Sequence, residues 1–82
     1  MSRSLDKILV VDIESTCWEG GYAQRGQISE IIEVGLCTLD VSKLRREDKC
    51  AIMVKPMKSR ISEFCSELTS ITPDMVELAK PL

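Results

Sequence analysis

The sequence predicts an α/β fold in which a three-stranded antiparallel meander is followed by two short helices. Three observations support this prediction. An apolar run is followed by two closely spaced acids, two further runs are rich in β-branched residues, and two short helical patterns follow a proline. With 82 residues, the chain has roughly half the length of a typical domain, so it can bury only a modest core.

The first strand is expected over residues 6–13, which include the apolar run 8–11. A short, mostly branched apolar run is typical of a strand buried on both faces. Asp12 and Glu14 are separated by one residue, so their side chains point to the same face of a strand. Neighbouring carboxylates repel each other, and a divalent cation between them removes the repulsion. The pair indicates a cation site, although an isolated D-x-E pattern also occurs where a strand simply reaches the surface.

A loop is expected over residues 15–28, where three glycines allow turns. Residues 29–40 are expected to form the second strand, since Gly35 and the β-branched residues argue against the alternative of a helix. The third strand is expected over residues 44–55, and a proline ends its ladder. Short connections between successive strands favour an antiparallel meander. Residues 43–49 carry charges of both signs, which indicates a solvated hairpin rather than a nucleic-acid patch.

Apolar residues at helical spacing then predict an amphipathic helix, with a stripe formed by Ile61, Phe64, Cys65 and Leu68. Either Ser59 or Ser62 is suited to cap its start, and the sequence leaves this choice open. A second helix is expected to start at Thr72, because an N-cap residue is followed there by a proline and an acid. Pro81 is expected to stop this helix, whose apolar side consists of Met75, Val76 and Ala79.

Composition excludes several classes of protein. The net charge is −2, so no basic field attracts nucleic acid, and any such binding has to be local or metal-mediated. No apolar run reaches the roughly 20 residues of a membrane span, so no membrane partner is expected. Four cysteines without a C-x-x-C pair, and without any histidine, argue against a zinc site. No signal segment is evident, so we expect a cytoplasmic protein with reduced thiols rather than a secreted one with two disulfides.

Several stretches beyond the D-x-E pair resemble the DnaQ-like DEDD superfamily of 3′–5′ exonucleases, which have a ribonuclease-H-like fold. The resemblance covers residues 8–79 and includes D-I-E-S-T, E-I-I-E-V-G, V-K-P and I-S-E-F-C-S-E-L-T-S-I-T in the family's order. Two motifs, S-T-C-W-E after the acids and S-E-F-C-x-E-L-T in the first helix, most resemble sequences of one branch. This branch contains the histone-mRNA 3′-exonuclease and the KapD-type (DEDDh) exonucleases.

The resemblance implies a metal-dependent hydrolase that releases 5′-mononucleotides from a single-stranded 3′ end, with RNA favoured over DNA. Asp12 and Glu14 are then the catalytic residues and the ligands of two Mg²⁺ or Mn²⁺ ions. The terminal nucleotide is expected to be bound by Ile13, Ser15, Thr16 and Trp18. Two alternatives stay open, because Thr16 equally suits a turn and Trp18 equally suits a packing anchor. Leu68 and Ile71 are expected to face the core, with contact to the terminal base as the alternative.

The chain also departs from the family pattern. Residues 1–82 resemble the N-terminal part of a single exonuclease domain, and the family's two further acids and its histidine have no counterparts here. We therefore expect the 82 residues alone to bind divalent ions weakly and to lack turnover. The open edge of the first strand predicts self-association, a complementing second fragment, or poor solubility. The alternative function is a non-catalytic binding or oligomerisation module that uses this edge. Ser70 replaces the usual glycine at a helix end, at a cost of up to about 1 kcal/mol.

Overall fold

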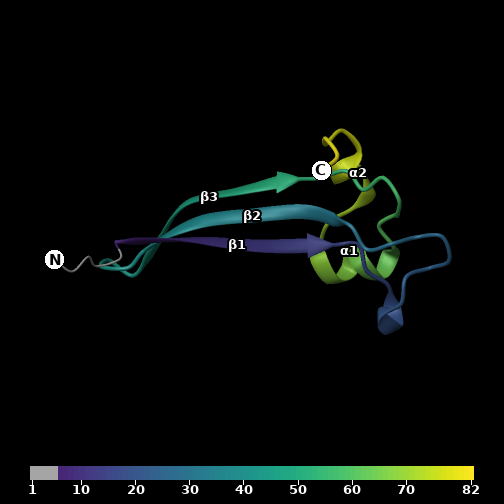
Figure 1. Cartoon of the computed structure of the whole chain (residues 1–82), viewed down its shortest axis with the longest axis horizontal. Helices are drawn as coiled ribbons and strands as arrows, with labels where there is room; N and C mark the ends of the chain where they lie inside the picture. Colours follow the sequence, from purple (N-terminus) through teal and green to yellow (C-terminus); the bar gives the residue numbers. More distant parts are fainter. Residues whose placement is uncertain (1–5) are drawn as a thin grey trace.

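The computed structural model describes residues 6–82, which form one antiparallel sheet with two short helices beyond one of its ends (Figure 1). The elements in chain order are β1 (Lys7–Ser15), a 3₁₀ turn η1 (Glu19–Gly21), β2 (Ile31–Asp40), β3 (Arg45–Met53), α1 (Glu63–Thr69) and α2 (Pro73–Glu77). The predicted meander followed by two helices is confirmed. None of the helices in this described part combines the length and the apolar character needed to span a membrane.

Strand β1 lies at an edge of the sheet, because the strand order is β1-β2-β3. The prediction that this strand is buried on both faces is wrong for the described residues, since Leu9 is 67% exposed and Val11 is 51% exposed. The physical reason is visible in Figure 1, where both helices lie past the strand ends and neither covers a sheet face. Strand β1 also extends two residues beyond the predicted range, to Ser15, because pairing with β2 continues there.

The core sits where the end of the sheet meets the helices. Its buried members are Ile32, Ile61, Cys65, Ile71 and Val76, and Cys17 and Met53 pack against them. Burying an apolar side chain of this size stabilises a fold by about 1.5–3 kcal/mol. Most of the packing therefore lies next to the segment that follows β1, so this end of the meander is the best-supported part of the molecule.

Helix α1 begins after Ser62, which resolves the choice between two candidate caps. The Ser62 hydroxyl accepts a hydrogen bond from the Cys65 N–H at 3.0 Å. The predicted apolar stripe is only partly correct, because Cys65 is fully buried whereas Leu68 is 68% exposed and Phe64 is 38% exposed. Ile61 is buried but precedes the helix, and no described element covers the outer side of α1.

Serine adopts a left-handed backbone conformation at the end of α1. Ser70 has φ 65° and ψ 13°, and its N–H donates to the Ser66 carbonyl at 2.8 Å. This is the geometry that favours glycine, and an L-residue adopts it at a steric cost. Helix α2 starts as predicted, with Thr72 at the N-cap and a proline in the first turn, but it ends at Glu77 rather than at Pro81.

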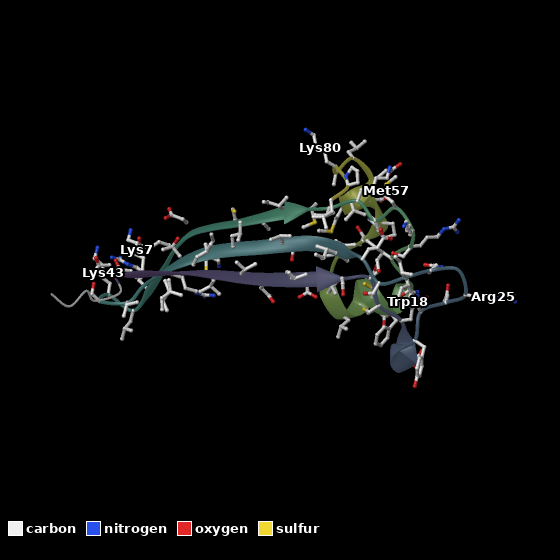
Figure 2. All side chains as sticks on the ribbon, in the orientation of Figure 1. Lys7, Trp18, Arg25, Lys43, Met57 and Lys80 are labelled. Carbon is white, nitrogen blue, oxygen red and sulfur yellow. The ribbon has the colours of Figure 1, made fainter. Side chains whose placement is uncertain are left out.

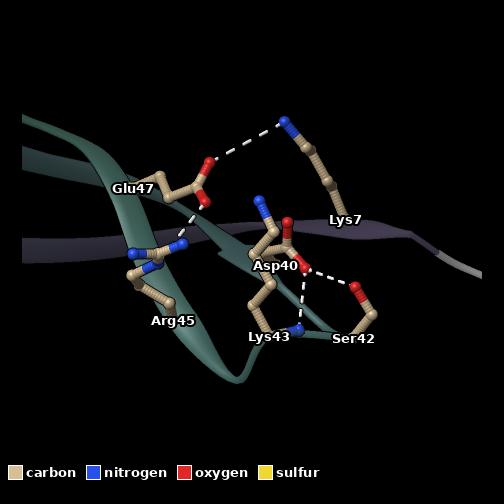
Figure 3. Close-up of polar contacts among 6 residues, drawn as sticks. All are labelled: Lys7, Asp40, Ser42, Lys43, Arg45 and Glu47. Atoms are coloured by element: carbon tan, nitrogen blue, oxygen red, sulfur yellow. Dashed lines mark hydrogen bonds and ion pairs between the residues drawn. The ribbon is translucent and has the colours of Figure 1, made fainter.

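The far end of the meander is a polar hairpin (Figure 3). The buried Asp40 carboxylate accepts hydrogen bonds from the Lys43 N–H at 3.0 Å and from the Ser42 hydroxyl at 2.9 Å, and these contacts lower the pKa of Asp40. Glu47 lies 3.8 Å from Lys7 and 3.9 Å from Arg45, in ion pairs that are largely exposed. The arrangement agrees with the predicted solvated hairpin and is remote from the helices.

Candidate active site

Asp12 and Glu14 lie on the same face of β1, at the end of the strand nearest the core. Their cross-strand partners on β2 are Gly35 and Glu33. Because Gly35 has no side chain, the Asp12 carboxylate is open toward β2. Asp12 is exposed and Glu14 is half-buried. Within residues 6–82, neither acid is paired with a lysine or an arginine, so both carboxylates are available to a cation.

A third carboxylate lies on the same face, because Glu33 is directly opposite Glu14. Its position opposite an acid follows from the register of β1 and β2. Three acids or other ligands do not converge on one point anywhere in residues 6–82. Asp12 and Glu14 thus offer two carboxylates on one face, and a divalent cation held there would need further oxygen ligands such as water.

A β-bulge follows Glu14 immediately. Glu14 pairs with Glu33 and Ser15 pairs with Ile31, so Ile32 is the extra residue on β2. Ile32 is fully buried in the core, and its carbonyl accepts the Val54 N–H at 2.8 Å. Bulges bend a strand and redirect side chains, and they are frequent beside active sites. Here the extra residue belongs to β2, so the irregularity lies opposite the step from Glu14 to Ser15, where β1 ends.

Three successive carbonyls after Glu14 each accept a hydrogen bond from a side chain. The Ser15 carbonyl accepts from the Cys65 thiol at 3.5 Å, and the Thr16 carbonyl accepts from the Ser29 hydroxyl at 2.8 Å. The Cys17 carbonyl accepts from Ser62 at 2.7 Å, so the cap of α1 also holds this segment. Residues from β1, from the loop before β2 and from α1 thus fix one short stretch of backbone.

Glu30 connects this stretch to the loop that follows β3. Its carboxylate accepts hydrogen bonds from the Met57 N–H at 2.9 Å, the Lys58 N–H at 2.7 Å and the Ser59 hydroxyl at 2.7 Å. Partial burial tends to raise the pKa of Glu30, but these hydrogen bonds, with the one from Ser59 the largest, outweigh it and lower the pKa. Glu30 is therefore an ionised carboxylate that holds the turn over residues 57–59.

The four residues expected to bind a nucleotide occupy different environments. Ile13 is 51% exposed on the face opposite the acids, and Ser15 is half-buried. Thr16 is 1% exposed and Trp18 is 7% exposed, so the structure favours the turn and the packing-anchor alternatives for these two side chains. Figure 2 shows Trp18 at the end of the molecule that carries the helices. Any contact of Thr16 with a ligand would therefore involve its backbone.

Two thiols lie in the same region. Cys17 is half-buried and Cys65 is fully buried in the core cluster. Burial, together with the neighbouring Cys65 and Glu14, raises the pKa of Cys17 to about 11. Cys17 is therefore a neutral group near Glu14, and Cys65 packs in the core.

Known proteins share this fold and the stretch that carries the two acids. The family model described as "Exonuclease" (RNase_T) matches residues 9–81. Rat 3′-5′ exoribonuclease 1 is 41% identical over 75 residues, which are 90% of this chain and 21% of that protein. Human ERI1 exoribonuclease 2 is 38% identical over 78 residues, covering 94% of this chain and 11% of that protein. The chain thus spans only a minor part of the curated relatives that it matches.

Solved structures agree with the sequence comparisons. The nuclease domain of 3′hExo, a DEDDh family member bound to rAMP, has a TM-score of 0.80 at 36% identity, over 93% of this chain and 38% of that chain. A 3′-exonuclease described as recognising the histone mRNA stem-loop has a TM-score of 0.82 at 34% identity, over 98% of this chain and 35% of that chain. The chain belongs to the DEDDh exonuclease family, in the branch of the histone-mRNA 3′-exonuclease. Members of this family use divalent metal ions.

Proposed function

We propose that this chain supplies the first two acids of a 3′–5′ exonuclease site, with Asp12 and Glu14 as catalytic metal ligands. One observation carries the proposal. The two carboxylates share one face of β1, make no ion pair within residues 6–82, and lie inside the region that matches the exonuclease family. The reaction is hydrolysis of the terminal phosphodiester with release of a nucleoside 5′-monophosphate.

The metal is Mg²⁺ or Mn²⁺, for which carboxylate oxygens are suitable ligands. When bound, such ions polarise the phosphodiester and activate the attacking water. Asp12 would serve as a ligand of both ions, and Glu14 would serve as a ligand of one ion and as a contact of the terminal 3′-hydroxyl. The residue paired with Asp12 on β2 is Gly35, which places no side chain beside this carboxylate.

The substrate is a single-stranded RNA 3′ end, with DNA disfavoured. The relatives that support this choice are named as exoribonucleases, and one neighbour is described with a histone mRNA stem-loop. Ile13, Ser15, Thr16 and Trp18 border the terminal nucleotide, with Thr16 contributing backbone groups because its side chain is buried. Trp18 acts chiefly by holding the loop that borders the nucleotide.

Residues 1–82 constitute the N-terminal part of a single exonuclease domain. The nuclease-domain structure is matched over only 38% of its length, and these 82 residues contain no histidine to act as general base. The 82-residue chain by itself is therefore expected to bind metal weakly and to have no turnover. We also propose an intracellular location, because all four cysteines are free thiols.

Two measurements test the proposed function. Titration of the chain with Mn²⁺ should give weak saturable binding that is lost in Asp12→Asn and Glu14→Gln. Glu67→Gln should bind normally, because the exposed Glu67 on α1 lies outside the acidic pair. In the second measurement, residues 8–79 replace the matched segment in the nuclease domain of a relative. An active chimera should release 5′-mononucleotides from RNA, and Asp12→Asn should abolish the activity. An inactive chimera that folds and binds RNA would refute the proposal.

A second candidate function is a non-catalytic module that self-associates through β1. The observation that favours it is the unpaired edge of β1, where Leu9 and Val11 are more than half exposed. Such an edge can pair with a strand of another chain. Sedimentation should show association that increases with concentration and weakens in Val11→Lys. Leu44→Lys, an equally apolar exposed site at the hairpin, is the matched control. A monomer at every concentration would rule this function out.

A further inference from the structure

The hydrogen bonds around Glu30 form a closed ring that includes the residue two positions after Glu14. The Glu30 N–H donates to the Thr16 hydroxyl at 2.8 Å. The Thr16 and Ser59 hydroxyls lie 3.0 Å apart, and the Ser59 hydroxyl lies 2.7 Å from a Glu30 carboxylate oxygen. The ring therefore starts at the backbone of Glu30 and returns to its side chain.

The direction of every proton in the ring can be assigned. An ionised carboxylate only accepts, so the single Ser59 hydroxyl proton is donated to Glu30. Ser59 must then accept from Thr16, whose own oxygen accepts the Glu30 N–H. In residues 6–82 the Thr16 hydroxyl has one other acceptor within reach, the Ile28 carbonyl, at the longer distance of 3.5 Å. With Glu30 ionised, the Thr16 and Ser59 hydroxyls each donate one hydrogen bond and accept one within the ring.

The ring also fixes the backbone of the catalytic strand. The Thr16 N–H donates to the Glu30 carbonyl at 2.8 Å, so one backbone–backbone hydrogen bond joins the two residues in addition to the ring. These contacts lie directly after the bulge that follows Glu14. Because Thr16 is 1% exposed, water does not compete for its hydroxyl. A change at Glu30 should therefore loosen the backbone at Thr16, two residues after Glu14.

We propose that Glu30 is a positioning residue that orients Glu14 for metal binding through the Thr16–Ser59 ring. This proposal rests on the proposed function of Glu14 as a ligand. Glu30 does not contact the metal or the substrate, and it acts by holding the backbone at Thr16. Its effect should consequently be local to the end of β1 and not shared by β2 and β3.

The test compares Glu30→Gln and Thr16→Val with the control Glu67→Gln. Glu30→Gln places an NH₂ group among the N–H and O–H donors that surround the Glu30 carboxylate. Thr16→Val removes the Thr16 hydroxyl while keeping the side-chain shape. Both should increase the hydrogen-exchange rate of the Thr16 amide by about tenfold or more, as expected for loss of a hydrogen bond to a charged group. The Val54 amide, which donates to Ile32, reports general destabilisation and should change much less. Thr16→Ser, which keeps the hydroxyl, should restore slow exchange.

Order parameters of the Glu14 amide and Mn²⁺ affinity complete the test. The ring-breaking variants should lower the Glu14 order parameter and weaken Mn²⁺ binding several-fold. Two outcomes would overturn the proposal by showing that the ring is purely structural. One is an equal increase in the exchange rates of the Thr16 and Val54 amides. The other is faster exchange at Thr16 with no change in the Glu14 order parameter or in Mn²⁺ affinity. If the wild-type chain binds no Mn²⁺, the proposed function fails, while the Glu14 order parameter still decides whether Glu30 positions this residue.

Discussion

Glu14 on β1 lies directly opposite Glu33 on β2, on the face that also carries Asp12. Directly opposed like charges destabilise an antiparallel pair. No lysine or arginine in residues 6–82 forms an ion pair with either glutamate. The register therefore places like charges opposite each other on the face that carries Asp12, although three acids do not converge on one point in residues 6–82.

Replacing Glu33 with glutamine should stabilise the fold. Removal of the repulsion between Glu14 and Glu33 is expected to raise the free energy of unfolding by about 0.2–1 kcal/mol, the range for a cross-strand pair of side chains. The gain should shrink in high salt, because screening weakens the repulsion in the wild type. Urea unfolding at low and high salt measures both effects.

Glu47→Gln is the control of opposite sign. Glu47 lies within ion-pair distance of Lys7 and Arg45, so its replacement should cost a little stability at low salt. If Glu33→Gln and Glu47→Gln shifted the unfolding midpoint in the same direction, repulsion between Glu14 and Glu33 would not be the cause.

Ser70→Gly should stabilise the chain by about 0.5–1 kcal/mol, because Ser70 has φ 65° and glycine adopts this conformation without a steric penalty. Ser66→Gly makes the same substitution inside α1, where it should destabilise by up to about 1 kcal/mol. Unfolding midpoints of the two variants should therefore move in opposite directions. A loss of stability in Ser70→Gly would contradict the conformational argument.

The sequence predicted the order and type of the elements because the patterns of apolar and β-branched residues are local. The predicted burial of side chains failed where it depends on which elements pack against one another. The apolar run of β1 is typical of a central strand, yet within residues 6–82 it has one neighbour and no covering layer. Phe64 and Leu68 are exposed for the same reason, since no described element packs on their side of α1.

The candidate site was predictable to a similar extent. The D-x-E spacing alone places Asp12 and Glu14 on one face. The position of Glu33 and the Glu30 ring were not predictable, because both depend on the register of β2 and on contacts between residues far apart in the chain. The hydroxyl side chains of Thr16 and Ser59 were the only signal in the sequence, and such residues are common in turns.

The contribution of Glu30 to the free energy of unfolding should decrease when the solution is acidified. The hydrogen bonds lower the pKa of Glu30 below its usual value of 4.5. A group with a lowered pKa in the folded state stabilises the fold above its unfolded pKa, and this contribution is lost as the pH falls through the folded pKa. The stability difference between the wild type and Glu30→Gln should thus be constant above about pH 4.5 and decrease below it.

Asp40 offers a matched control for this pH dependence. Its pKa is lowered from 3.8 by hydrogen bonds from Lys43 and Ser42, at the opposite end of the meander. In Asp40→Asn the difference from the wild type should decrease at lower pH than in Glu30→Gln. A stability difference for Glu30→Gln that grows on acidification would have the wrong sign and refute the assignment of an ionised Glu30.

The four thiols should differ in reactivity according to burial. Cys50 is exposed, Cys65 is fully buried, and the pKa of Cys17 is raised to about 11. Because the thiolate is the reactive form, a rise from 9.0 to about 11 lowers the reactive fraction of Cys17 by about 100-fold. Iodoacetamide at near-neutral pH should modify Cys50 first, and Cys17 and Cys65 last, as followed by mass spectrometry. In urea all four should react at similar rates, because unfolding removes burial. Native labelling of Cys17 as fast as that of Cys50 would mean that the segment after Glu14 opens readily, contrary to the three carbonyl contacts that hold it.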